Sequence, residues 1–63
     1  MKRFELEKIA KQIVQQENII MNKSSSKEDI QKAENEIFKI TAKYNLNLFD
    51  MIEIDEIVQN MLQ

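Results

Sequence analysis

No glycine or proline interrupts this chain of 63 residues. These two residues are the strongest local helix breakers, so a chain without them can continue a helix over long runs. Only two segments have the composition of turns, the serine-rich stretch 22–26 and the asparagine-flanked stretch 45–47. We therefore expect a single all-α domain over residues 1–63, with helices at about 3–21, 27–44 and 48–62.

Each of the three runs has an apolar face when it is projected as an α-helix. The short linkers make consecutive helices antiparallel neighbours, so the first two helices should pair as a hairpin. The predicted fold is a three-helix bundle, formed by this hairpin and a third, acidic amphipathic helix. The apolar faces contain Leu6, Ile9, Ala10, Ile13, Val14, Ile20 and Met21 in the first run, Ile30, Ala33, Ile37, Ile40 and Tyr44 in the second, and Met51, Ile54, Ile57, Val58, Met61 and Leu62 in the third.

The first turn carries a helix-starting signal. Ser26 with Asp29, or Ser25 with Glu28, has the spacing of a capping box, in which a serine and an acidic side chain satisfy each other's backbone N–H groups. Either pair predicts that the second helix begins near Lys27.

The second turn carries both a stop and a start signal. Asn45 can adopt the left-handed conformation that ends a helix, and Asn47 can cap the next helix with Asp50 at its third position. The third helix should therefore begin close to Leu48.

Glu17 interrupts the apolar face of the first helix, between Ile13 and Ile20. In one interpretation the buried part of the helix ends near this point, or the carboxylate reaches solvent along its own stem. In the other, Glu17 is a buried polar residue that sets register or receives a lysine from a partner. The sequence leaves both interpretations open.

The residue types that perform most enzyme chemistry are missing. The chain has no cysteine and no histidine, which excludes disulfides, thiolate zinc sites and histidine ligands. Asp50, Glu53 and Glu56 form an acidic face on the third helix, but three carboxylates on one short helix lack the enclosing geometry of a calcium loop. We expect no enzymatic activity, no bound metal and no cofactor.

Charge and hydropathy also limit the partners. The third helix contains four acidic residues and no basic one, so DNA phosphates would repel it. No segment resembles a signal peptide or approaches the length of an apolar membrane span. We expect a cytoplasmic protein that binds neither nucleic acid nor membrane.

Several large apolar side chains lie at or beyond the edges of the apolar faces. A single domain of this length has marginal stability, and association with another chain would stabilise it. We therefore predict a homo-oligomer, with a dimer favoured, that acts as a self-associating regulatory or adaptor module and also binds an unidentified protein. The alternative is an acidic decoy or inhibitor that occupies a basic or nucleic-acid-binding site of a partner enzyme. The predicted interface residues are Phe4, Ile19, Phe38, Phe49 and Ile52.

Overall fold

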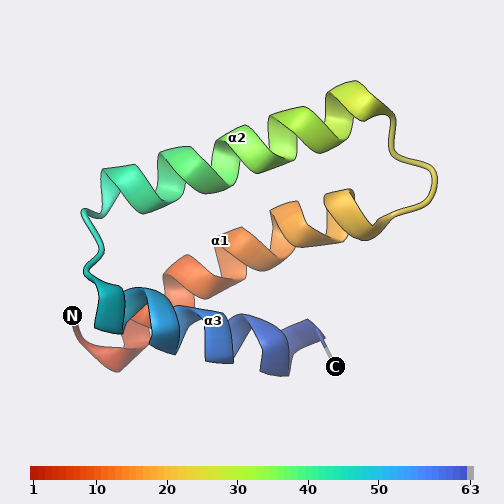
Figure 1. Ribbon diagram of the computed structural model, residues 1–63. Coiled ribbons are helices and arrows are strands. Elements are labelled where there is room, and N and C mark those ends of the chain that lie inside the picture. Colours follow the sequence, from red (N-terminus) through yellow and green to blue (C-terminus); the bar gives the residue numbers. More distant parts are fainter. Residues whose placement is uncertain (63) are drawn as a thin grey trace.

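A computed structural model describes residues 1–62 and shows three helices, α1 (Arg3–Met21), α2 (Lys27–Lys43) and α3 (Leu48–Leu62) (Figure 1). These residues contain no strand, which confirms the all-α prediction. The predicted and observed bounds differ at one place. The second helix ends at Lys43 and not at Tyr44, which is the residue that caps it.

The central element of the fold is α1, which packs against both of the other helices. In Figure 1, α2 runs antiparallel to α1, and α3 turns back along the opposite side of α1. No close backbone approach joins α2 to α3. The arrangement is therefore more open than a bundle in which every helix touches the other two.

The hydrophobic core lies mainly between α1 and α3. Burying each of its branched aliphatic side chains contributes about 1.5–3 kcal/mol to the free energy of unfolding. The second helix supplies one fully buried residue, Ala33, and covers the core with the half-buried side chains of Ile37, Ile40 and Tyr44. The buried residues of α1 and α3 are Leu6, Ile9, Ala10, Ile13, Ile54, Ile57 and Val58.

A capping box starts α2, and it uses the first of the two predicted pairs. The Asp29 N–H donates to Ser26 Oγ at 3.1 Å, and the Ser26 N–H donates to Asp29 Oδ2 at 3.4 Å. Two N–H groups that the helix itself leaves without partners are thereby satisfied. The capping box defines where α2 begins.

The second turn also has the predicted geometry. Asn45 is in the left-handed region with a φ of 48°, which stops α2. The Asp50 N–H then donates to Asn47 Oδ1 at 2.7 Å and caps the start of α3. This tight turn sends α3 back toward the start of α1.

Replacing Ser26 with alanine should lower the free energy of unfolding by about 1 kcal/mol, because the Asp29 N–H loses its acceptor. Urea unfolding followed by circular dichroism at the helical band measures this change. Ser24→Ala is the matched control, since among the described residues Ser24 takes part in the turn only through its backbone N–H, which donates to Asn22 Oδ1. Equal effects of the two substitutions would contradict the capping role.

Candidate protein-binding surfaces

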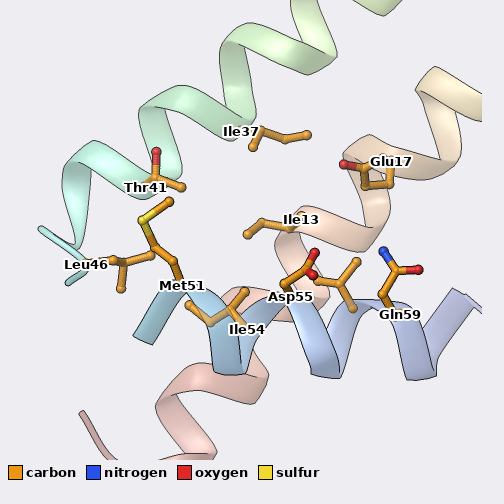
Figure 2. Close-up of a pocket in the computed structure, with 10 residues that line it drawn as sticks. Ile13, Glu17, Ile37, Thr41, Leu46, Met51, Ile54, Asp55 and Gln59 are labelled. Atoms are coloured by element: carbon orange, nitrogen blue, oxygen red, sulfur yellow. The ribbon is translucent and has the colours of Figure 1, made fainter. Parts of the chain in front are cut away.

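A groove lies between α2 and α3 and is also lined by residues of α1. It consists of two adjoining hollows of about 180 and 530 Å³, which share the lining residues Glu17, Ile37, Thr41 and Met51. Figure 2 shows the side chains around the first hollow, contributed by all three helices and by the turn at Leu46. The groove is the space that remains because α2 and α3 do not close upon each other. Its other lining residues are Ile13, Ile20, Glu34, Phe38, Leu46, Ile54, Asp55, Val58 and Gln59.

The groove exposes apolar surface that is continuous with the core. Ile13, Ile54 and Val58 are buried core residues that also form its floor. Phe38 on α2 and Met51 on α3 are exposed at its sides. A partner that enters the groove would extend the core of the protein.

All charged residues that line the groove are acidic. Glu17 comes from α1, Glu34 from α2 and Asp55 from α3, and no lysine or arginine is among the lining residues. Within residues 1–62, none of the three carboxylates takes part in an ion pair. The groove is thus apolar along its floor and negative along its rim.

Glu17 belongs to the groove and not to the core. Its side chain is half-buried, and the described residues include no buried polar or charged group. Figure 2 shows it beside the groove, on the same helix as Ile13. The carboxylate of the single chain therefore keeps access to solvent. A role in receiving a lysine from a partner stays a prediction.

The five predicted interface residues are all exposed, but they do not form one surface. Phe38 lines the groove, whereas Ile19 lines a separate hollow between α1 and α2. Phe49 and Ile52 project from the side of α3 that faces away from its buried residues. Phe4 is exposed in the first turn of α1. An interface across Phe38, Phe49 and Ile52 would have to extend from the groove around α3.

Sequence reasoning missed several groove residues. It assigned Met51 to the core face of α3, yet about half of this side chain is exposed. It counted Asp55 among the four acidic residues of the third helix and gave it no place in an interface, although Asp55 follows Met51 by one helical turn and shares the groove with it. Glu17 was the available signal, because a carboxylate within an apolar face marks a place where that face is not fully covered.

The acidic face of α3 is partly neutralised by the start of the chain. The Met1 amino group lies 4.0 Å from Asp50 Oδ1, and Arg3 Nη1 lies 3.4 Å from Glu53 Oε2. Glu56 is exposed and makes no ion pair within residues 1–62. In the described part of the chain, no three acidic side chains come together as a metal site.

Comparisons of this chain with protein families, with curated proteins and with solved structures find no match. Among residues 1–62, no helix combines the length and apolar character needed to cross a lipid bilayer.

Replacing Glu17 with leucine should leave the free energy of unfolding unchanged or raise it by up to about 1 kcal/mol, because a half-buried carboxylate beside Ile13 and Ile37 becomes apolar. Urea unfolding measures the change. Gln15→Leu, on the exposed side of the same helix, is the control and should stay within about 0.5 kcal/mol of the parent. A loss above about 1 kcal/mol for Glu17→Leu would show that the carboxylate has a stabilising partner.

Proposed function

We propose that this protein acts by binding protein chains, including a second copy of itself, and not by catalysis. The observation that carries the proposal is the exposure of large apolar side chains. Phe38, Phe49 and Ile52 are 75%, 80% and 51% exposed in a chain of only 63 residues. Single apolar residues on a surface are ordinary, but several on one small domain are typical of an interface.

The outer face of α3, defined by Phe49 and Ile52, is the proposed centre of a homodimer. These two residues lie about one helical turn apart, so they form one patch on the side of α3 opposite the core. In a twofold dimer the same patch of both copies would pack together. The small core of a single chain favours this association, because burying the patch adds apolar contacts that the monomer lacks.

The hydroxyl groups offer little support for an enzyme. Thr41, which lines the groove, donates its Oγ1–H to the carbonyl oxygen of Phe38 at 2.9 Å. This bond holds the hydroxyl against its own helix, and among the described residues no carboxylate accepts a hydrogen bond from it. A chain that also lacks histidine and cysteine is better suited to a regulatory or adaptor role than to catalysis.

The acidic-decoy alternative is less well supported. A decoy for a basic site would present the carboxylates of α3, but Asp50 and Glu53 already face the Met1 amino group and Arg3. This internal pairing reduces the negative charge that α3 can offer to another protein. The apolar surface is the stronger basis for binding.

The homodimer can be tested by light scattering after size exclusion. At micromolar concentration the parent should have at least twice the 7.5 kDa mass of the chain. Ile52→Lys should shift the mass toward the monomer, because a charge would be buried at the centre of the contact. The new lysine lies one turn from Glu56 on the same helix, so helix content should be retained.

Gln15→Lys is the control for this experiment, since it makes the same change of charge at an exposed position on α1. It should keep the mass of the parent. A parent protein that is monomeric at micromolar concentration, or two variants with the same mass, would contradict dimerisation through α3.

A further inference from the structure

We propose that the groove between α2 and α3 is a binding site for a basic amphipathic helix of another protein. The site goes beyond the proposed homodimer, because it is a different surface from the outer face of α3 and does not depend on dimerisation.

The groove occupies the position of a fourth helix. All three helices line it, and the backbones of α2 and α3 stay apart, so a helix placed there would touch all three. Along α2 the lining extends from Glu34 to Thr41, which corresponds to about 10 Å at 1.5 Å per residue. This length accommodates about two turns of a partner helix, which would present apolar residues at i, i+3 or i+4, and i+7.

The apolar part of the groove is suited to such a helix. The side chains of Phe38 and Met51 are exposed, and those of Ile20 and Ile37 are half-buried. A helix that packs its apolar face against them would remove these four side chains from water. This burial would supply the main driving force for binding.

The charges around the groove specify a basic partner. Each helix contributes one carboxylate, Glu17 from α1, Glu34 from α2 and Asp55 from α3, and no lining residue is basic. Lysine and arginine have long apolar stems, so a partner can lie over apolar surface while its cationic groups reach the rim. Each carboxylate that contacts a lysine or arginine of the partner would replace hydrogen bonds to water with a charge-assisted hydrogen bond.

The same charges disfavour two other occupants. In a twofold dimer formed through the groove, the three carboxylates of one copy would face the same three carboxylates of the other. Like charges placed together across an interface oppose association. A nucleic acid is disfavoured in the same way, because its phosphates would meet the acidic rim.

The binding experiment uses fluorescently labelled model peptides and measures anisotropy. The probe is a peptide of leucine and lysine, about four turns long, with its leucines on one helical face. A peptide with glutamate in place of lysine controls for charge, and a scrambled leucine–lysine peptide controls for amphipathic pattern. The parent should bind the probe at least about tenfold more tightly than either control peptide, and binding should weaken as salt is raised.

Matched variants of the protein test the site. The rim variant, Glu17→Gln with Glu34→Gln and Asp55→Asn, should weaken probe binding at least about tenfold. The control variant, Glu5→Gln with Glu36→Gln and Glu56→Gln, makes the same change in net charge outside the groove and should weaken binding less than about threefold. Thr41→Trp places a large side chain in the groove and should block the probe while circular dichroism still reports a helical protein.

Equal weakening by the rim and control variants would overturn the proposal, since the probe would then respond only to net charge. Parent-like binding by folded Thr41→Trp would overturn it as well. If Thr41→Trp instead converts a dimer into a monomer and the parent fails to bind the probe, a second copy occupies the groove and the proposal is wrong. The Ile52→Lys protein should bind the probe within about threefold of the parent, so failure of the homodimer and failure of the groove site can be distinguished.

Discussion

Burial of the apolar stripe of α1 is the interaction on which the rest of the structure depends. Leu6, Ile9, Ala10 and Ile13 are buried, and they supply more than half of the seven-residue core cluster that α1 forms with α3. Both other helices pack on α1, whereas no close backbone approach joins α2 to α3. Loss of contact with α1 would therefore leave α2 and α3 without a shared core. The open groove is a consequence of the same arrangement. Both α2 and α3 pack on α1, but their backbones do not pack closely on each other, so a space remains between them.

The helix bounds could be predicted from sequence because local chemistry determines them. Ser26 caps the helix that follows it, Asn45 adopts the left-handed conformation that ends a helix, and Asn47 accepts the N–H of Asp50. Each effect acts within a few residues, and no glycine or proline elsewhere in the chain competes with these signals. The helical periodicity also identified all the buried residues of α1 and α3, because spacing determines which residues share one face of a helix. It also placed Met51 and Met61 on the apolar face of α3, where they are exposed.

The groove could not be predicted because it depends on how helices diverge, which helical spacing does not encode. Met51 has core spacing and yet remains half-exposed, and it lines the groove together with Phe38. The exposure of the five predicted interface residues followed from projecting each segment as a helix. Their placement on different surfaces depends on how the helices pack and could not be read from that projection.

The charge pattern of the sequence predicted only part of the electrostatics of the fold. It identified the acidic face of the third helix, but it did not show that Arg3 pairs with Glu53 or that the rim carboxylates remain outside the ion pairs of residues 1–62.

Stability and binding are coupled in a protein of this design. A ligand that binds the folded chain and not the unfolded one stabilises the fold by an amount that grows with the logarithm of its concentration over its dissociation constant. The groove floor includes Ile13, Ile54 and Val58, which are also core residues, so an occupant would pack directly against the side chains that hold α1 and α3 together. An occupant would also contact both α2 and α3, whose backbones do not pack closely on each other. Binding in the groove would therefore raise the stability of the whole domain, and the folded population of this small protein would depend on the concentration of its partner.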